Sequence, residues 1–408
     1  MMLVMLFTSA WMNKSHYLAL FYGVVAVLCG WPYVGVLFIP FTVETLYTRG
    51  LIKSILVGAA MGGIVLVLEL LVNFNYYQRW VLPAWNIFVY NVLSNETDST
   101  LYGTEPMSYY LLNLALNFNV VAILAAPAVI FVFVLPSHYK TRKMQLVMYL
   151  SPMYIWVVIM FSQAHKEERF LSPVYPLFCL ASATTLSAMV YRIGQYFSHI
   201  RVLNNRLSQL FVLGTLGVYS LLSVSRVVSN VVNFSAPLRV YQHLYAKLLP
   251  NPQTDMFYDG VTASTTTVNL CLTKEWYRFP TSFFIPSNNT KVQFVKSSFS
   301  GLLPKPFEEH MNGTSIIPSA MNNQNREEPS RYVSIDACDF VVDLNLPSQK
   351  EIKFWEEPAT WELVYSEQFL DAERSKSPYR SFYIPLLTPR YVHYAEYAIY
   401  KRKKAVSN

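Results

Sequence analysis

Apolar stretches long enough to cross a lipid bilayer dominate the first half of the chain. A membrane helix needs roughly 20 mostly apolar residues, because a rise of about 1.5 Å per residue has to cross about 30 Å of hydrocarbon. The clearest candidates are residues 54–71, 111–135, 144–162, 171–191 and 210–228. Weaker ones are residues 17–31 and 33–47, and residues 1–11 are apolar but too short. These stretches predict a polytopic α-helical membrane protein with about seven to eight membrane segments.

Charge divides the chain into two parts. Residues 1–228 contain 20 charged side chains, 13 of them basic, whereas residues 229–408 contain 37. This predicts a transmembrane region over residues 1–228 and a soluble domain over residues 229–408. The net charge of +7 lies almost entirely in the apolar part, so we interpret it as a topology signal and expect no nucleic-acid partner.

Basic residues between the apolar stretches predict the orientation in the membrane, because they are retained on the cytosolic side. They fall in three connections that can share that side: Arg49 and Lys53; Lys140, Arg142 and Lys143; and Arg192, Arg201 and Arg206. The opposite, luminal side then receives the loops 73–110 and 163–170 and the domain 229–408.

Acceptor sequences for N-glycosylation give a second indication of orientation, because they are modified only on the luminal side. Four sequences of the form Asn-x-Ser/Thr fall on the predicted luminal side, at Asn95, Asn233, Asn288 and Asn312. All four are therefore candidate glycosylation sites.

Cys271 and Cys338 both lie in the predicted luminal domain. An oxidising compartment permits a disulfide between them, and two free buried thiols are the alternative. Neither has a second Cys or a His at ligand spacing, so no metal site is expected.

The domain 229–408 combines short β-prone runs with Pro-rich turns such as residues 303–306. The runs are residues 291–295, 340–344, 361–365 and 391–400. This pattern predicts an α+β fold for the luminal domain.

The densest functional candidate is the predicted luminal turn 165–170, which reads His-Lys-Glu-Glu-Arg-Phe. Its cations, His165, Lys166 and Arg169, can hold a phosphate group, with Glu167 and Glu168 ordering them. Alternatively, Glu167 and Glu168 cap the following helix by complementing its N-terminal dipole. From the residues alone both interpretations stay open.

A second candidate is the luminal loop that ends in Tyr102-Gly103-Thr104-Glu105-Pro106. A carboxylate at this boundary, Glu105, can act as a base or bind sugar hydroxyls. Aromatic residues of the same loop can stack on sugars, although an interfacial aromatic belt explains them equally well. They are Trp80, Trp85, Tyr90, Tyr102, Tyr109 and Tyr110.

Several of these segments resemble one family. The stretch 165–176 is similar to the His-Lys-Glu-x-Arg-Phe signature of the dolichyl-phosphate-mannose-dependent α-1,2-mannosyltransferases of glycosyltransferase family 22. Further matching stretches are residues 102–106, 116–119, 274–280, 303–307 and 327–332. The resemblance runs from about Gly30 to the C-terminus.

The resemblance implies a GT-C fold in the endoplasmic reticulum membrane. It implies transfer of mannose from dolichyl-phosphate mannose, in α-1,2 linkage, to a dolichyl-diphosphate-linked oligosaccharide during assembly of the N-glycan precursor. A β-linked donor and an α-linked product mean inversion, which needs a base that activates the acceptor hydroxyl. His165, Lys166 and Arg169 would balance the charge of the leaving phosphate, without a metal or another cofactor.

One departure concerns the base. Family members open with a first span and a large luminal loop whose acidic residues are thought to supply it, whereas no Asp or Glu precedes Glu44 here. The resemblance therefore implies that the base lies in a loop missing from this chain. Within the chain itself, Glu105 is the candidate base. The alternatives are a catalytically inactive truncated isoform or a luminal scaffold, and, from another class, a transporter or lipid-handling membrane protein.

Overall fold

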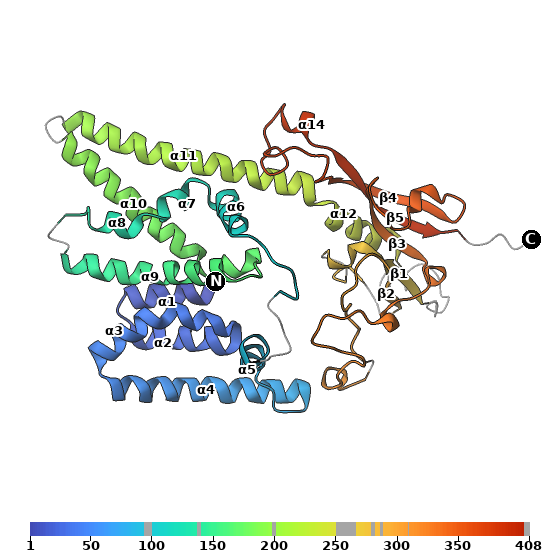
Figure 1. Cartoon of the computed structure of the whole chain (residues 1–408), viewed down its shortest axis with the longest axis horizontal. Helices are drawn as coiled ribbons and strands as arrows, with labels where there is room; N and C mark the ends of the chain where they lie inside the picture. The colour runs from blue at the N-terminus through green and yellow to red at the C-terminus, as the bar shows by residue number, and fades with distance from the viewer. Residues whose placement is uncertain are drawn as a thin grey trace, which may run out of the picture. The chain divides into compact units, whose positions relative to one another are not determined.

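The computed structural model divides the chain into two compact units (Figure 1). Unit 1 consists of Met1–Ser223 and Phe307–Ser319, and unit 2 of Val224–Pro306 and Ala320–Asn408. The structure describes residues 1–93, 100–136, 140–197, 201–249, 267–278, 282–285, 289–308 and 310–403.

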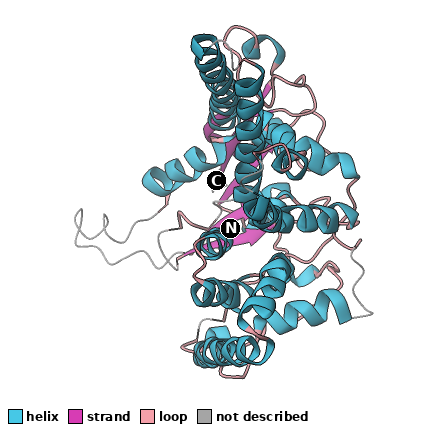
Figure 2. Cartoon of the chain, turned by 90° about the vertical axis from the view of Figure 1, so that its left-hand side faces the viewer, coloured by secondary structure: helices cyan, strands magenta, loops and turns pink. Residues whose placement is uncertain are grey.

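Unit 1 is built from helices, and all the described strands belong to unit 2. Figure 2 distinguishes the helices, in cyan, from the strands, in magenta. The principal helices are α1 (Met2–Met12), α2 (His16–Val25), α3 (Ile39–Arg49), α4 (Leu51–Tyr77), α5 (Pro83–Phe88), α6 (Met107–Phe118), α7 (Val120–Ala125), α8 (Ala128–Val132), α9 (Lys140–Ser162), α10 (Tyr175–Tyr196) and α11 (Arg201–Phe234), which continues into unit 2. Short π or 3₁₀ segments are η1 (Ala26–Gly30), η2 (Pro32–Phe38), η3 (Val89–Leu93), η5 (Glu168–Val174) and η8 (Gly313–Ser315).

Four helical segments within the described ranges are long and apolar enough to cross a membrane. They are Leu51–Tyr77, Lys143–Ser162, Glu168–Tyr196 and Asn205–Phe234. In α4, Val65 is the one buried residue, and a helix that is apolar all round needs lipid or other protein around it. The helices Met2–Met12 and His16–Gly30 are apolar but shorter. A helical membrane protein is thus confirmed in outline, and seven to eight segments stay a prediction.

The expected single helix over residues 111–135 is wrong, because the structure divides this stretch into α6, α7 and α8. Asn119 ends α6 with φ of +41° and its side-chain Oδ1 accepts a hydrogen bond from Val120 N at the start of α7. Pro127 has no N–H to continue the ladder and lies between α7 and α8. These breaks make three short helices, of which α7 and α8 pack along α10.

An aromatic cluster joins the N-terminal helices to α9. The rings of Phe7 and Phe38 lie 4.1 Å apart, and the ring of Trp11 meets that of Tyr149 edge-on at 4.8 Å. The indole N–H of Trp11 donates to Glu44, which also pairs with Lys14. This core fixes α9, and α9 leads directly into the turn 163–167.

Unit 2 contains a five-stranded mixed sheet in the order β2-β1-β3-β5-β4. Its strands are β1 (Val268–Leu272), β2 (Thr290–Phe294), β3 (Phe340–Asn345), β4 (Trp361–Leu370) and β5 (Tyr394–Arg402). β1 runs parallel to β2 and β3, whereas β5 is antiparallel to β3 and β4. Four strands overlap the predicted runs, and β1 was not predicted.

Helices and short turns complete unit 2. Val240 and Tyr241 of α12 (Ala236–His243) and Leu244 pack with Leu270, Val342 and other inward-facing strand residues in one core. A second core contains Val341, Phe354 and Trp361, and there Cys271 on β1 is joined to Cys338 by a disulfide. The remaining elements are α12 (Ala236–His243), η6 (Leu244–Leu248), η7 (Lys274–Tyr277), η9 (Pro329–Arg331), η10 (Ile335–Ala337), η11 (Phe354–Glu356) and α14 (Thr388–Tyr391).

Candidate functional site

The turn between α9 and η5 holds His165 between two oxygen acceptors. His165 Nδ1 lies 2.8 Å from the carbonyl oxygen of Gly103, and Nε2 lies 3.1 Å from Oε1 of Glu167. Because a carbonyl oxygen only accepts, Nδ1 donates in the first contact. The imidazole ring is therefore fixed on both sides, one of them by a loop 62 residues earlier in the chain.

Glu167 links His165 to Arg169. Its Oε1 accepts from Arg169 Nη2 at 2.9 Å, and its Oε2 lies 2.5 Å from Arg169 Nε. Burial acts to raise the pKa of Glu167, but the hydrogen bonds from His165 and Arg169 outweigh it and hold this pKa below its ordinary value. Glu167 is thus a stable anion that orients the His165 ring and the Arg169 guanidinium.

Arg169 and Lys166 occupy opposite environments, although both were predicted to bind a phosphate. The Arg169 side chain is 76% exposed beside the Phe170 ring, so its remaining N–H groups can meet an anionic ligand. Lys166 is only 6% exposed. Its ammonium donates to the backbone carbonyls of Gln163 and, at 2.8 Å, Glu105.

The side chains of the two remaining acidic candidates, Glu168 and Glu105, take no part in the contacts that join His165, Glu167 and Arg169. Glu168 Oε1 accepts from Asn117 Nδ2 at 2.7 Å, which ties the start of η5 to α6. Glu105 has an exposed side chain, and its backbone N–H donates to Ala164 O at 3.1 Å. Glu105 therefore contributes its backbone to the loop contact with the turn.

A pocket of about 440 Å³ opens beside His165. A volume of this size suits a small-molecule group. Its walls are mainly aromatic, and a few polar groups project into it. The lining residues are Trp31, Tyr33, Val36, Tyr90, Asn91, Val92, Tyr102, Trp156, Ile159, Met160, Gln163, His165 and Phe170.

The aromatic wall is one connected assembly. The Trp31 ring lies 5.4 Å from that of Trp156 and 5.5 Å from that of Phe170, and the Trp156 indole donates to Phe170 O at 2.8 Å. On the loop side, the hydroxyls of Tyr90 and Tyr102 are 3.0 Å apart. The fixed rings make a rigid apolar surface next to the cationic turn.

Sequence reasoning found only part of this wall. Tyr90 and Tyr102 were candidates for stacking on sugars, and they do line the pocket, whereas Trp80 and Trp85 do not. Trp31 and Trp156 were missed, because they lie in segments that were interpreted only as membrane spans. The local signals are weak: Trp31 directly precedes Pro32, and Trp156 lies on the predicted span that leads into the turn 163–170.

The glycosylation candidates differ in accessibility. Asn312 is exposed. Asn233 is fully buried, donates to Ser229 Oγ and accepts from the Tyr394 hydroxyl, both at 2.9 Å. A glycan at Asn233 does not fit this fold, which corrects that expectation. Asn95 and Asn288 lie outside the described residues.

A comparison with known protein families matches residues 1–286 to the Alg9-like mannosyltransferase family. The chain belongs to this family. The match includes the whole turn 163–170 and every residue that lines the pocket beside His165.

Curated relatives carry the same family name. The chain is 37% identical over 407 residues to alpha-1,2-mannosyltransferase ALG9 of Mus musculus, covering 98% of this chain and 65% of the relative. It is 38% identical to the Homo sapiens protein of that name, with the same coverage, and 28% identical to that of Saccharomyces cerevisiae, over 96% of this chain and 69% of the relative. The chain thus spans slightly less than two thirds of the mouse and human proteins. No solved structure matches it.

Proposed function

We propose that this chain transfers mannose from dolichyl-phosphate mannose, in α-1,2 linkage, to a dolichyl-diphosphate-linked oligosaccharide. Membership in the Alg9-like mannosyltransferase family supports the reaction class, and the relatives named alpha-1,2-mannosyltransferase support the linkage. The observation that carries the proposal is the aromatic pocket lined by His165 and Phe170, together with the exposed Arg169 guanidinium, which lies 5.7 Å from the Phe170 ring.

In this proposal Arg169 binds the phosphate of the donor, and His165, whose two ring nitrogens contact Gly103 O and Glu167, holds Glu167 in position. A guanidinium presents N–H groups in a fork that matches phosphate oxygens, and Glu167 already holds the fork in place. The aromatic wall would receive the apolar part of the lipid or a face of the sugar. Lys166 acts as a positioning residue, because its ammonium fastens the Gly103–Glu105 loop to the turn.

The proposed reaction is an inverting displacement. The acceptor hydroxyl oxygen forms a bond to the anomeric carbon of mannose as the bond from that carbon to the phosphate oxygen breaks. The hydroxyl proton passes to a base, and dolichyl phosphate leaves with the electron pair. Cations at the leaving oxygen stabilise the negative charge that develops there.

Glu105 is the candidate base within the chain, but its location argues for a different role. Its side chain is exposed and does not line the pocket, whereas its backbone groups contact Lys166 and Ala164. We therefore expect Glu105→Gln to retain transfer, because the substitution leaves the backbone contacts in place.

We place the protein in the endoplasmic reticulum membrane, with the turn, the pocket and unit 2 on the luminal side. The four long apolar helices support a bilayer location. The exposed sequon at Asn312 is compatible with a luminal side for the segment that carries it.

Mannose transfer in microsomes tests the proposal. Microsomes that contain the wild-type chain as the sole enzyme of this kind should transfer radiolabelled mannose from dolichyl-phosphate mannose. Arg169→Ala should reduce transfer by about 10- to 100-fold, through lost stabilisation of the leaving phosphate, and Glu105→Gln should not. Full transfer by Arg169→Ala would remove the phosphate-binding role. No transfer by a folded wild-type chain would favour the inactive or scaffold alternative.

A further inference from the structure

A second pocket, of about 340 Å³, lies in unit 2 at the carboxyl ends of its three parallel strands. Its lining comes from the segments that follow β1 and β2 and from the end of β3. The lining residues are Lys274, Glu275, Trp276, Tyr277, Arg278, Ser298, Phe299, Leu344 and Leu346. Segments that follow the carboxyl ends of parallel strands are a recurrent place for ligand sites. Residues 274–278, which belong to a stretch singled out by its sequence, thus form one side of a pocket that the proposed transfer reaction does not use.

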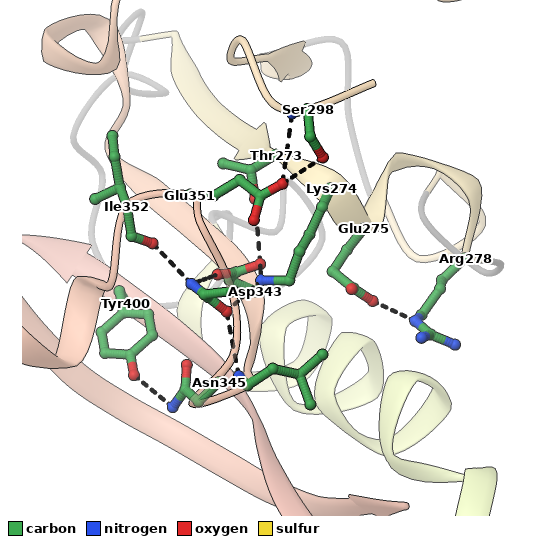
Figure 3. Close-up of polar contacts among 12 residues, drawn as sticks. Thr273, Lys274, Glu275, Arg278, Ser298, Asp343, Asn345, Glu351, Ile352 and Tyr400 are labelled. Atoms are coloured by element: carbon green, nitrogen blue, oxygen red, sulfur yellow. Dashed lines mark hydrogen bonds and ion pairs between the residues drawn. The ribbon is translucent and has the colours of Figure 1, made fainter. Parts of the chain in front are cut away.

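The first charged group of this pocket, Lys274, is tied to a buried carboxylate. Lys274 Nζ lies 2.7 Å from Oδ1 of Asp343 and 2.6 Å from Oε1 of Gln349. Asp343 is fully buried and also accepts from Thr273 Oγ1 at 3.1 Å and Gln349 Nε2 at 3.3 Å. Figure 3 shows these contacts converging on Asp343. Polar groups are therefore held in fixed positions at the pocket floor.

The second charged group, Arg278, is paired in the same way. Its guanidinium bonds to Glu275 within one short turn (Figure 3). The guanidinium centre lies 5.1 Å from the Tyr277 ring and 4.4 Å from the Phe369 ring. Glu275 is only 2% exposed. The two cations of the pocket are thus matched by two buried carboxylates.

A further carboxylate lies at the rim. Glu351 Oε1 accepts from Ser298 Oγ at 2.5 Å, and Ser298 lines the pocket. Lys274 and Arg278 contribute two positive charges and Asp343, Glu275 and Glu351 three negative ones, so the formal local charge is −1. An anionic ligand such as a phosphate would have to compete with these carboxylates, so a neutral ligand is favoured.

Aromatic rings form the remaining wall. Trp276 packs against Phe299 with ring centroids 4.5 Å apart, which holds its indole in place. Tyr277 follows it, lines the pocket and is 60% exposed, so its ring is accessible to a ligand. Aromatic faces next to ordered hydrogen-bonding groups fit the two kinds of surface on a pyranose ring, C–H groups on its faces and hydroxyls around its edge.

We propose that this pocket binds a neutral sugar ring of an oligosaccharide. The rings of Trp276 and Tyr277 contact a face of the sugar. Hydroxyl groups, which both donate and accept, bond to the paired Lys274, Arg278 and Glu275 side chains. The site is separate in sequence and unit from the turn 163–170, so it stands whether or not that turn binds a donor phosphate.

Binding of free oligosaccharides to the full chain in detergent tests the proposal. Saturation-transfer NMR and a fluorescence titration would use a neutral oligomannose, a maltooligosaccharide and a chitooligosaccharide, with mannose and mannose 6-phosphate as a matched neutral and anionic pair. We expect at least one neutral sugar to bind, and mannose 6-phosphate to bind more weakly than mannose.

The Tyr277→Ala and Trp276→Ala variants should each weaken that binding by roughly tenfold, because they remove part of the stacking surface. Tyr245→Ala is the matched control, since Tyr245 is a partly exposed tyrosine of the same unit outside the pocket. Arg169→Ala should also leave this binding unchanged, which separates it from the proposed transfer site. Thermal unfolding of each variant confirms that it folds.

Three results would overturn the proposal: no binding of any neutral sugar at millimolar concentration, unchanged binding in folded Tyr277→Ala and Trp276→Ala, or tighter binding of mannose 6-phosphate than of mannose. The source of the sugar is resolved by two further arms. One arm measures binding of a lipid-linked oligosaccharide and the other binding of a glycopeptide that carries the same glycan. The ligand that binds more tightly identifies the source of the sugar.

Discussion

Lys166 and Arg169 provide the sharpest prediction, because the structure assigns different roles to two cations of one signature. Lys166→Met keeps the aliphatic stem and removes the ammonium that donates to Glu105 O and Gln163 O. A hydrogen bond from a charged donor is worth about 1.5–3 kcal/mol, and a buried acceptor left without a partner carries its own cost. With Lys166 6% exposed, we expect unit 1 to lose about 3 kcal/mol of stability.

Arg169→Ala should behave differently. The Arg169 side chain is 76% exposed, and exposed ion pairs contribute about 0–1 kcal/mol. We therefore expect Arg169→Ala to leave stability almost unchanged while it reduces mannose transfer, and Lys166→Met to reduce both. Thermal unfolding in detergent, measured beside transfer in microsomes, separates the two effects.

The reasoning would be refuted by the opposite pattern. If Lys166→Met unfolded at the wild-type temperature and lost only transfer, the ammonium would face the ligand and not the carbonyls. If Arg169→Ala were strongly destabilised, its pairing with Glu167 would be structural. Arg169→Lys serves as a second control, because it keeps the charge and removes the fork geometry; transfer should be only partly restored.

Three further predictions concern other features. Tyr102→Ala should lower transfer several-fold because Tyr102 lines the pocket beside His165, whereas Trp80→Ala, an exposed aromatic outside it, should not; equal effects in the same microsomal assay would contradict the assigned wall. Endoglycosidase treatment should shift the electrophoretic mobility of the wild type and of Asn233→Gln equally. If Asn312 carries a glycan, Asn312→Gln should show a smaller shift. Loss of a glycan in Asn233→Gln would contradict the buried position of Asn233. The pKa of Asp371 lies below its ordinary 3.8, because the hydrogen bonds from Arg374 outweigh its burial. A carboxyl group whose pKa is lowered by folding stabilises the protein at pH values above its unfolded-state pKa, and this stabilisation is lost as the pH falls through its folded-state pKa. Asp371→Asn should therefore be less stable than the wild type at pH 7 in denaturant titrations, with a difference that shrinks below pH 3.8. A difference in stability that widened on acidification would contradict this.

Local sequence signals predicted the elements of this protein well where one signal dominated. Long apolar runs gave α4, α9, α10 and α11, whose lengths leave few alternatives to a helix in a bilayer. Short β-prone runs predicted β2, β3, β4 and β5. β1 was missed because its five residues show little alternation and it is paired on both sides by β2 and β3.

The errors arise where a side chain acts through a distant partner. Pro127 was visible inside the stretch 111–135, but the break at Asn119 depends on a positive φ that its sequence does not specify. Lys166 was grouped with His165 and Arg169 because the three are adjacent in sequence. Its partner, the carbonyl of Glu105, lies 61 residues away, and no local pattern indicates such a contact.

The most direct test of the proposed function is the linkage of the product. The chain is expressed in microsomes without another enzyme of this kind and supplied with dolichyl-phosphate mannose labelled in the sugar and with lipid-linked oligosaccharide. We predict that label enters the oligosaccharide and is released by an α-1,2-specific mannosidase, and that Arg169→Ala lowers its incorporation. Label in another linkage, or incorporation that is equal with and without the chain, would contradict the account.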